Sequence, residues 1–325
     1  MNILEHKFED FISIDNLLLA WREFIRGKRN KKDVQEFSFY LMDNILSLHE
    51  DLKNFKYKHG IYEQFKINDP KSRTIHKASV RDRLLHHAVH RILYPFFDKI
   101  FIFDSFSCRD GKGTHKAINR FREFGNIVSK NNTKTCWVLK CDIKKFFASI
   151  DQNILIKILS KRINDEKIVN LLREIISSFE LSGLPLGNLT SQLFANVYLN
   201  ELDRFIKCNL KIEHYIRYAD DFVILSQDKK YLEYLLPGIN DYLQSRLKLM
   251  LHPNKVFIEV LSSGVDFLGC VNFQDHRTLR LKTKKRILHK IKNNPNTETL
   301  NSYFGLIKHG DSSHFKKSII NRIAL

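Results

Sequence analysis

Two neighbouring carboxylates, Asp220 and Asp221, lie in the stretch HYIRYADDFVILS at residues 214–226. Runs rich in β-branched and aromatic residues flank the pair, which predicts a β-hairpin with both acids at its tip. Because side chains alternate along a strand, we expect Tyr218 and Asp220 to share one face and Asp221 to point to the other. Aspartate is also a common turn residue, so a plain hairpin turn is the simpler alternative. However, acids held among Ile, Tyr, Phe and Val are costly without a compensating cation, which favours a functional site.

A third carboxylate, Asp142, ends the mostly apolar run CWVLKCD at residues 136–142. This run predicts a buried strand. A strand fixes the direction of the carboxylate at its end, and carboxylate oxygens are ligands that suit a hard divalent cation. Asp142 and Asp220 are far apart in the sequence, so only the fold can bring them together. Phe146 and Phe147, which follow shortly after, are equally compatible with a plain core role.

The charge of the chain indicates a polyanionic partner. The sequence holds 54 Lys and Arg against 36 Asp and Glu, a net charge of +18 with a pI near 9.6. Nucleic acid is the first candidate for that partner, although compositional drift toward Lys could supply part of the excess. Residues 52–90 carry nine Lys and Arg against three acids, and residues 276–325 carry twelve against two. These basic segments flank a less basic centre that holds the acids, which predicts a positive cleft around an acidic site.

Length and composition set the broad class of the protein. The 325 residues are enough for two or three packed subdomains, and 43% hydrophobic with 28% charged residues is typical of a globular protein. The sequence contains no run of 18 or more apolar residues, so it predicts no transmembrane helix. The N-terminus lacks a signal-type apolar stretch, and we therefore expect a cytoplasmic protein. Five cysteines without C-x-x-C spacing predict reduced thiols. His86 and His90 would share a helix face, but no H-E-x-x-H pattern accompanies them, so we expect no histidine metal site.

The remaining sequence predicts helices and strands around two segments with chemical potential. Strands at 62–68 and 73–77 flank a turn at 69–72, and their cations Lys66 and Arg73 could clamp a triphosphate or be simply solvated. A Gly/Pro loop that begins at Gly183 leads into a helix, and its N–H groups could contact a phosphate or could only form a loop. Helices are predicted within 1–55, and the second of these, at 33–52, follows a basic loop at 26–32 that is either a solvated connector or a backbone contact. The other predicted helices are at 80–97, at 114–129, two within 152–179, and at 190–208, 229–250 and 282–292, with a last helical pair joined near His309. Two further strands are predicted at 255–261 and 265–270.

Five sequence motifs occur in an order and at intervals that resemble those of reverse transcriptases. They are CDIKKFF, GLPLGNLTSQLFANVYLNELD, RYADDFVIL, LHPNKVFI and GVDFLGC. Each motif alone is weakly specific, but five in this order are strongly specific. The resemblance covers nearly the whole chain, roughly from residue 62 to residue 314.

Two further details resemble one subfamily, the reverse transcriptases of diversity-generating retroelements. Bacterial intron and retron enzymes usually carry a P-Q-G-x-x-x-S-P type loop, whereas this chain has Pro185, Leu186 and Gly187 followed by Ser191 and Gln192. The later stretch SYFGLIKH at 302–309 also resembles this subfamily. The chain departs from it only in a minor way, at Ala219, where members often carry Met or Val. No endonuclease, RNase H or other appended domain is evident, which is consistent with such compact enzymes.

The resemblance implies an α+β fold of the right-hand polymerase type. Its palm would be an antiparallel sheet backed by helices, with fingers on one side and a short helical thumb. We expect an N-terminal helical segment at 1–55, fingers at 56–140, a palm at 141–271 and a basic helical thumb at 272–325. Residues of about 152–185 would contribute to the fingers.

The resemblance also implies roles for single residues. Asp142, Asp220 and Asp221, with the backbone carbonyl of Ile143, would hold two Mg²⁺ ions about 3.5–4 Å apart. One ion would acidify the primer 3′-hydroxyl, and the other would neutralise the triphosphate and the departing pyrophosphate. Lys255 matches the lysine proposed to protonate that pyrophosphate.

A second group of residues would contact the incoming nucleotide. Lys66 and Arg73 match finger cations that grip the phosphates, and Phe147 matches the aromatic gate that excludes a 2′-hydroxyl. Leu186 replaces a usual Gln that can hydrogen-bond near the nucleotide, and a lost contact of ~1 kcal/mol lowers discrimination roughly fivefold. A packing role without effect on fidelity is the alternative for Leu186. The substrate-binding residues implied are Lys66, Arg73, Ile143, Phe147, Leu186, Gly187 and Gln192.

The leading hypothesis is therefore an RNA-directed DNA polymerase of a diversity-generating retroelement. It would copy a template-repeat RNA into adenine-mutagenised cDNA, an error-prone step of mutagenic retrohoming. Its partners would be template RNA, cDNA or primer, dNTPs and a small basic accessory variability protein, with no membrane. The basic C-terminal helices would track the template–primer backbone, and residues 265–269 would grip the primer. Alternatives are a retron, group II intron or phage-defence reverse transcriptase, a two-metal nuclease, and a catalytically silent RNA-binding module.

Overall fold

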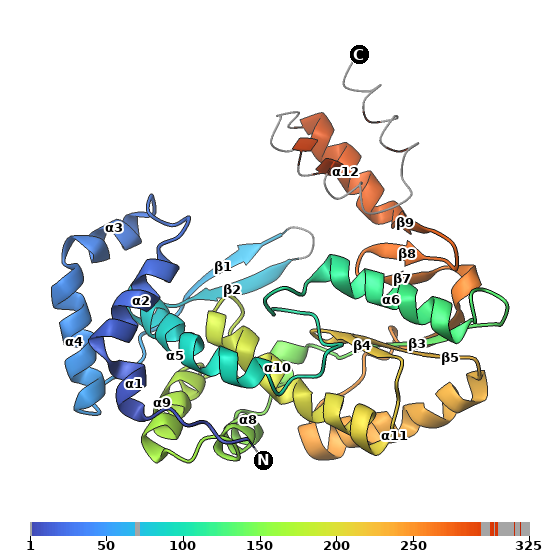
Figure 1. Ribbon diagram of the computed structural model, residues 1–325. Coiled ribbons are helices and arrows are strands. Elements are labelled where there is room, and N and C mark those ends of the chain that lie inside the picture. The colour runs from blue at the N-terminus through green and yellow to red at the C-terminus, as the bar shows by residue number, and fades with distance from the viewer. Residues whose placement is uncertain are drawn as a thin grey trace. The chain divides into compact units, whose positions relative to one another are not determined.

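The computed structural model describes residues 2–68, 72–293, 300, 301, 303, 304, 315 and 319. The backbone forms two compact units, between which the chain passes several times (Figure 1). The first unit comprises Met1–Ile102, Ile143–Phe205 and Asp241–Met250, and the second comprises Phe103–Asp142, Ile206–Asn240 and Leu251–Leu325. Residues 69–71 of the turn predicted at 69–72, the motif at 302–309 and the last helical pair lie outside the described residues, apart from the single positions given above.

The first unit is mostly helical and carries one β-hairpin. Its described elements are α1 (Phe8–Ile12), α2 (Ile14–Phe24), α3 (Lys32–Phe39), α4 (Leu41–Lys53), β1 (Glu63–Ile67), β2 (Arg73–Lys77), α5 (Val80–Asp98), α7 (Phe146–Ser149), α8 (Gln152–Ser160), α9 (Glu166–Ser177) and α10 (Leu189–Arg204). Ser13 and Ser79 cap α2 and α5 by accepting backbone N–H groups of the first turn. The single helix predicted at 33–52 is wrong, because the backbone leaves the helical region at Tyr40 (φ −112°, ψ 42°) between α3 and α4.

The long helix α5 runs through the core of the first unit. The side-chain amide of Asn16 on α2 donates to the Ala88 carbonyl of α5 at 3.2 Å, and α10 packs on the same helix. His86, on the buried side of α5, is 1% exposed, and its Nδ1 lies 3.1 Å from the Thr190 hydroxyl of α10. Its Nε2 lies 3.1 Å from Nε2 of His59. Burial lowers the pKa of His86 to about 3, so the ring is neutral at physiological pH.

The neutral state of His86 predicts an acid-labile first unit. The unfolded histidine binds a proton below about pH 6.5 while the folded one does not, so stability should fall as the pH decreases from there. We expect His86→Asn to flatten this slope and to remove about 2 kcal/mol of the loss between pH 6.5 and pH 4.5. Urea unfolding at several pH values measures it. His289→Asn on α12 is the matched control, and an equal effect of both substitutions would contradict the assignment.

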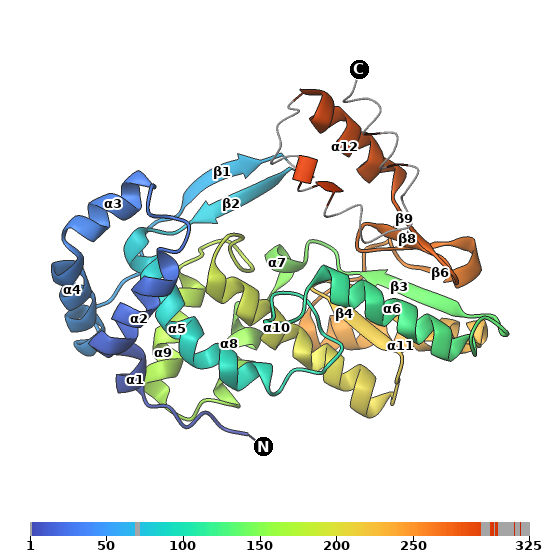
Figure 2. The same ribbon diagram turned by 45° about the horizontal axis from the view of Figure 1, so that its top comes forward.

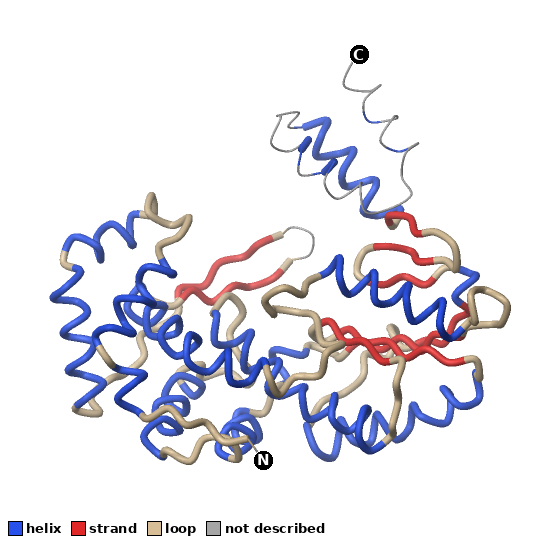
Figure 3. Tube along the Cα trace, viewed as in Figure 1, coloured by secondary structure: helices blue, strands red, loops and turns tan. Residues whose placement is uncertain are grey.

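The described residues of the second unit form two antiparallel sheets and the helices that pack on them (Figure 3). Strands β3 (Trp137–Asp142), β4 (Tyr215–Tyr218), β5 (Asp221–Ser226) and β6 (Phe257–Val260) form a four-stranded sheet of order β4-β5-β3-β6. Strands β7 (Val265–Phe267), β8 (Cys270–Asn272) and β9 (Arg277–Leu279) form the smaller sheet. The other described elements are α6 (Thr114–Val128), α11 (Lys229–Leu247), which ends in the first unit, α12 (Leu281–Asn293), a π-helical turn at Phe205–Asn209 and a 3₁₀ turn at Leu261–Ser263.

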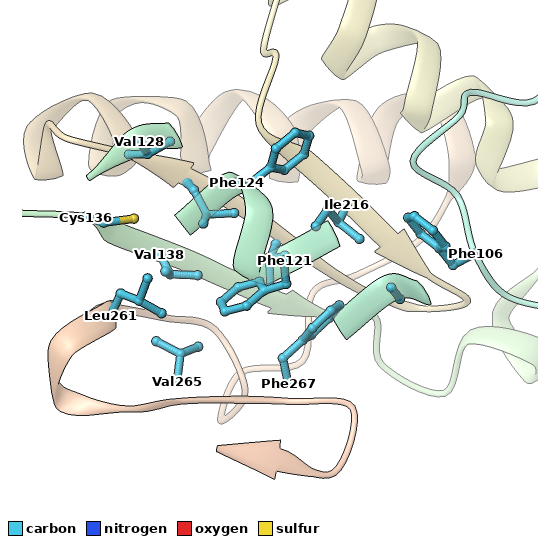
Figure 4. Close-up of a cluster of buried hydrophobic side chains, with 13 residues drawn as sticks. Phe106, Phe121, Phe124, Val128, Cys136, Val138, Ile216, Leu261, Val265 and Phe267 are labelled. Atoms are coloured by element: carbon cyan, nitrogen blue, oxygen red, sulfur yellow. The ribbon is translucent and has the colours of Figure 1, made fainter. Parts of the chain in front are cut away.

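One apolar cluster fastens α6 and β7 to one face of the four-stranded sheet (Figure 4). The ring of Phe121 on α6 packs at a tilt against the ring of Phe267 on β7, with ring centroids 5.4 Å apart, and both rings are fully buried. Val138 and Ile216 supply the sheet side of the cluster. The single strand predicted at 265–270 is wrong, because Leu268 has a positive φ of 51° and the chain reverses there between β7 and β8.

No helix among the described residues is long and apolar enough to span a membrane. All five cysteines are free, and Cys136, Cys141 and Cys270 are buried.

Candidate active site

The β4–β5 hairpin carries two of the three predicted acids at its tip. Tyr218 pairs with Asp221 across the strands, so the turn contains only Ala219 and Asp220. The expectation that Tyr218 and Asp220 share a face is wrong, because cross-strand partners point to the same side and strand alternation does not continue through a turn. Tyr218 and Asp221 therefore share a face. Ala219 has a positive φ of 53°, the backbone region that a first turn residue needs to reverse two strands.

The third acid, Asp142, lies directly opposite Asp221. Strand β3, labelled in Figure 2, has β5 as a neighbour in the sheet, and the antiparallel register of the two strands pairs these two residues. Asp142 is the last residue of β3, and Asp221 is the first of β5, so both carboxylates lie at the same end of the sheet. Asp220 is the residue before Asp221. The fold thus brings together the strand end and the turn that are far apart in the sequence.

Two lysines face these acids. The ammonium group of Lys255 donates to both carboxylate oxygens of Asp142, each at 2.9 Å. Lys140, two residues before Asp142 on the same strand face, lies 3.6 Å from Oδ2 of Asp221 and donates to the Asp266 carbonyl at 2.7 Å. Lys140 is only 8% exposed. A buried ammonium so placed compensates a carboxylate that the interior would otherwise disfavour.

The Asp221 carboxylate stays poorly solvated in spite of Lys140. Burial raises its pKa to about 7; Lys140 acts in the opposite direction, while the charges of Asp142 and Asp220 raise the pKa further. Its Oδ1 atom is buried and has no hydrogen-bond partner. An unpartnered buried carboxylate oxygen beside two other acids is a position that a cation would stabilise.

The donor chemistry of this site fits a hard divalent cation, but the side chains are not gathered around one position. Among the residues that the structure describes, no three His, Cys, Asp or Glu side chains lie close enough to hold a metal ion. Asp142 points its two oxygens at Lys255. Each Asp142 oxygen keeps a second lone pair that could bind a metal ion, and the ammonium of Lys255, whose side chain is 41% exposed, would then compete with that ion for the carboxylate.

The other predicted site residues belong to the first unit. Ile143, the residue after Asp142, is 1% exposed, and Phe147 is half-buried on α7. Lys66 on β1 and Arg73 on β2 are exposed near the turn of their hairpin. Leu186, Gly187 and Gln192 lie in the loop before α10 and in its first turn, where Gln192 is exposed.

The loop that holds Leu186 is fixed to the β1–β2 hairpin. The backbone N–H of His76 on β2 donates to the Leu186 carbonyl at 2.9 Å, and the side-chain amide of Asn188 donates to the His76 carbonyl. Gly187, with φ of 113°, lies against Ile75. The structure thus brings Leu186 and Gly187 together with the hairpin that carries Lys66 and Arg73.

Two residues that support the hairpin tip were not predicted. Lys140 could have been found by its spacing, because residues two apart on a strand share a face and Asp142 ends that strand. Arg217 is fully buried, and its guanidinium donates to the Ala219 carbonyl at 3.2 Å and to the Ser105 hydroxyl at 3.1 Å. Ser105 comes from a distant loop, so no sequence signal identifies this second contact.

Comparison with known proteins decides the family. Residues 63–271 match the family model described as reverse transcriptase (RNA-dependent DNA polymerase). The chain belongs to the reverse transcriptase family. Among its curated relatives, protein YkfC of Escherichia coli is 24% identical over 255 residues, which cover 66% of this chain and 65% of that protein. The group II intron-encoded protein LtrA of Lactococcus lactis is 25% identical over 293 residues, covering 68% of this chain and 47% of LtrA.

Solved structures of telomerases share the fold of this reverse transcriptase. Apo telomerase from Candida tropicalis, truncated from its C-terminal domain, superposes with a TM-score of 0.51 at 15% identity, covering 74% of this chain and 60% of that one. Telomerase from Candida albicans in complex with a fragment of telomeric RNA superposes with a TM-score of 0.51 at 10% identity. The match covers 83% of this chain and 58% of the telomerase chain. The expected α+β right-hand polymerase fold is confirmed. The chain spans 65% of YkfC and about half of LtrA, so it corresponds to part of these relatives.

Proposed function

We propose that this reverse transcriptase is an RNA-directed DNA polymerase whose catalytic acids are Asp142, Asp220 and Asp221. One observation carries the proposal. The register of β3 and β5 sets Asp142 opposite Asp221, beside Asp220, at one end of a buried sheet. Metal-assisted nucleotidyl transfer needs carboxylates held together in this way. A plain hairpin turn would explain Asp220 and Asp221, but it would not explain why the neighbouring strand β3 also ends in an acid.

Divalent metal is the cofactor that this arrangement suits. Asp142, Asp220 and Asp221, with the carbonyl of Ile143, would hold two Mg²⁺ ions. When bound, they supply an acidified primer hydroxyl and charge neutralisation at the triphosphate. Lys140 keeps a positive charge beside Asp221, which limits the repulsion between the acids. Lys255 carries a proton that it can give to the leaving pyrophosphate once it leaves Asp142.

The nucleotide and the nucleic acid would be bound by the other predicted residues. Lys66 and Arg73 would grip the triphosphate, and Phe147 would pack under the sugar. The basic helix α12 would follow the template–primer backbone, which makes binding strongly salt-dependent. In this proposal residues 56–140 are fingers, 141–271 are palm with about 152–185 contributing to the fingers, and 272–325 are the thumb, after an N-terminal helical segment at 1–55.

Primer extension on an RNA template tests the proposed activity. The full chain should extend a DNA primer with dNTPs in the presence of Mg²⁺ and should be inactive in EDTA. Degradation of the primer or template instead of extension would indicate a two-metal nuclease. Tight RNA binding without any synthesis would indicate a silent RNA-binding module. Either result would overturn the polymerase assignment.

The finer function that we propose is adenine-mutagenic copying of a template-repeat RNA in a diversity-generating retroelement, aided by a small basic accessory protein. Leu186 supports it. The Leu186 side chain is half-buried in the loop that is fixed to β2. A glutamine at this position could hydrogen-bond near the nucleotide, whereas the aliphatic side chain of leucine has no hydrogen-bonding group. Loss of one polar contact relaxes the selection between correct and incorrect nucleotides.

Leu186→Gln should therefore raise fidelity. Restoring a contact of ~1 kcal/mol is expected to lower misincorporation opposite template adenine about fivefold. Sequencing of the cDNA made by the wild type and the variant on one RNA template measures the change. Leu186→Met keeps the bulk without an amide and should retain the wild-type error rate. Equal error spectra for the wild type and Leu186→Gln would make Leu186 a packing residue.

A group II intron-type reverse transcriptase is the second candidate. The match to the group II intron-encoded protein LtrA favours it. The two candidates differ in what lies beside their gene. Near-identical repeats that differ at adenines would support the diversity-generating function, whereas a flanking intron RNA that co-purifies with the protein would support the second candidate.

A further inference from the structure

The short helix α7, which carries Phe147, rests on a loop from a distant part of the chain. We call residues 179–184 the saddle loop. The backbone N–H of Leu184 donates to the Phe147 carbonyl at 2.8 Å. The hydroxyl of Ser182 donates to the next carbonyl, that of Ala148, at 3.3 Å. The backbone position of Phe147 is thus set by hydrogen bonds to this loop.

Glycine is the only residue that this contact accommodates at position 183. A Cβ atom on Gly183 would lie 2.2 Å from the Phe147 carbonyl oxygen and 2.6 Å from the Cα of Ala148. Both are backbone atoms, so α7 itself would have to move. Gly183 also has a φ of 91°, which L side chains rarely adopt. The close approach therefore depends on the missing side chain.

The side chain of Gln152 connects three backbone carbonyls of the saddle loop. The amide nitrogen of Gln152, at the start of α8, lies 3.0, 3.4 and 3.0 Å from the carbonyl oxygens of Phe179, Leu181 and Gly183. Its two N–H groups donate to these three carbonyls, so one N–H is shared between two of them. Three carbonyls that converge on one amide fix the curvature of the loop. Because Gln152 follows α7 closely in the chain, it links the loop to the segment that bears Phe147.

Both ends of this region are fastened to the same residue of the β1–β2 hairpin. The Phe179 ring packs edge-on to the His76 ring, with centroids 4.8 Å apart. Beyond the saddle loop, the Leu186 carbonyl accepts a hydrogen bond from the backbone N–H of His76, and the Asn188 side-chain amide donates one to the His76 carbonyl. The hairpin that carries Lys66 and Arg73 and the helix that carries Phe147 are therefore joined through one continuous stretch, residues 179–188.

We propose that Gly183 and Gln152 are positioning residues that set the sugar selectivity of the enzyme by fixing the backbone of Phe147. The inference rests on the proposed polymerase function and on the gate role of Phe147. If the saddle loop shifts α7 away, the aromatic ring no longer closes the space beside the sugar, and a 2′-hydroxyl fits. The two residues touch no substrate and act only through Phe147.

Single-nucleotide incorporation tests this role. The full chain extends a DNA primer on an RNA template with dCTP or with CTP, and kcat/KM is measured for each. Gly183→Ala should lower the ratio of the two efficiencies about tenfold, because small displacements at a reacting site have large effects. Gln152→Glu keeps the size but puts a carboxylate against three carbonyls, and it should lower the ratio about threefold. The second variant carries the test if Gly183→Ala does not fold.

Matched substitutions serve as controls. Gly238→Ala adds the same methyl group where nothing lies within 4 Å, and Gln244→Glu adds the same charge at an exposed position. Both should keep the wild-type ratio. A general loss of rate with an unchanged ratio in Gly183→Ala and Gln152→Glu would overturn the positioning role alone. A wild-type protein that makes no DNA on an RNA template would overturn the proposed function, and this inference with it.

Discussion

Asp221→Asn is expected to abolish DNA synthesis and, at the same time, to stabilise the protein at pH 8. The variant loses a carboxylate of the proposed catalytic centre, so its rate should fall roughly a thousandfold or more. The free energy of unfolding of the variant should rise at pH 8. Burial raises the pKa of Asp221 to about 7, so ionisation of this residue in the wild type opposes folding. Losing function while gaining stability is typical of a residue kept for chemistry.

The sign of the stability effect depends on pH. The unfolded Asp221 loses its proton near pH 4, whereas the folded one keeps it until about pH 7, so wild-type stability falls across that interval. Asparagine does not ionise and removes this loss. The variant should therefore be about 1–2 kcal/mol more stable than the wild type at pH 8, with part of the gain cancelled because Lys140 loses its partner. Below pH 4 the two proteins should be equally stable.

Urea unfolding in EDTA at pH 4 and pH 8 measures the stability of both proteins, and primer extension measures their activity. Asp241→Asn, a neutralisation at an exposed position of α11, is the control and should change neither quantity. If Asp221→Asn lost both activity and stability at pH 8, Asp221 would be a residue that stabilises the fold. Wild-type activity in Asp221→Asn would remove this residue from the catalytic centre.

Phe147→Ala is expected to admit ribonucleotides. The ring is half-buried on α7 and packs edge-on against Phe146, with centroids 5.4 Å apart, so its position is well defined. The proposed gate would work by exclusion, and removing the ring should lower the preference for dCTP over CTP by roughly two orders of magnitude. The rate with dCTP should change far less, because in the proposed role the ring would only contact the sugar and would make no bond with the reacting atoms.

Phe147→Tyr is the matched control, because it keeps the ring and should keep most of the selectivity. The kcat/KM values for dCTP and CTP on one RNA template measure the ratio. An unchanged ratio in Phe147→Ala would mean that another residue faces the sugar. In that case the alignment of this segment with the family motif would be wrong.

The acids and their neighbours show how far sequence reasoning reached. A run of apolar residues that ends in Asp142 predicts a strand, and β3 ends at that residue. The β4–β5 hairpin was also predicted, since turn chemistry and β-branched flanks are local signals. The face of Asp221 was predicted wrongly, because which residues form the turn depends on the pairing register, and register is set by tertiary packing.

Long-range contacts explain what the sequence did not reveal. The break at Tyr40 between α3 and α4 has no Gly or Pro to mark it, because Tyr40 and its neighbours are ordinary helix residues. The reversal between β7 and β8 does carry a local signal, since Gly269 (φ 90°) follows Leu268, but a single glycine in a strand pattern is also compatible with a bulge. The bonds from Arg217 to Ser105 and from Lys140 to Asp266 join segments that only the folded chain brings together. Gly183 was seen only as part of a loop, since the contact that demands a glycine is with Phe147.

An isolated β-bridge between Ser105 and Arg217 covers part of one edge of the four-stranded sheet. Strand β4 is the outermost strand on its side, and such a strand normally offers backbone groups that another chain can pair with. Here the N–H of Arg217 donates to Asp104 and its carbonyl accepts from Phe106, each at 3.0 Å. A second molecule thus finds the backbone groups in the middle of this edge already paired, which disfavours edge-to-edge association of two copies of the chain.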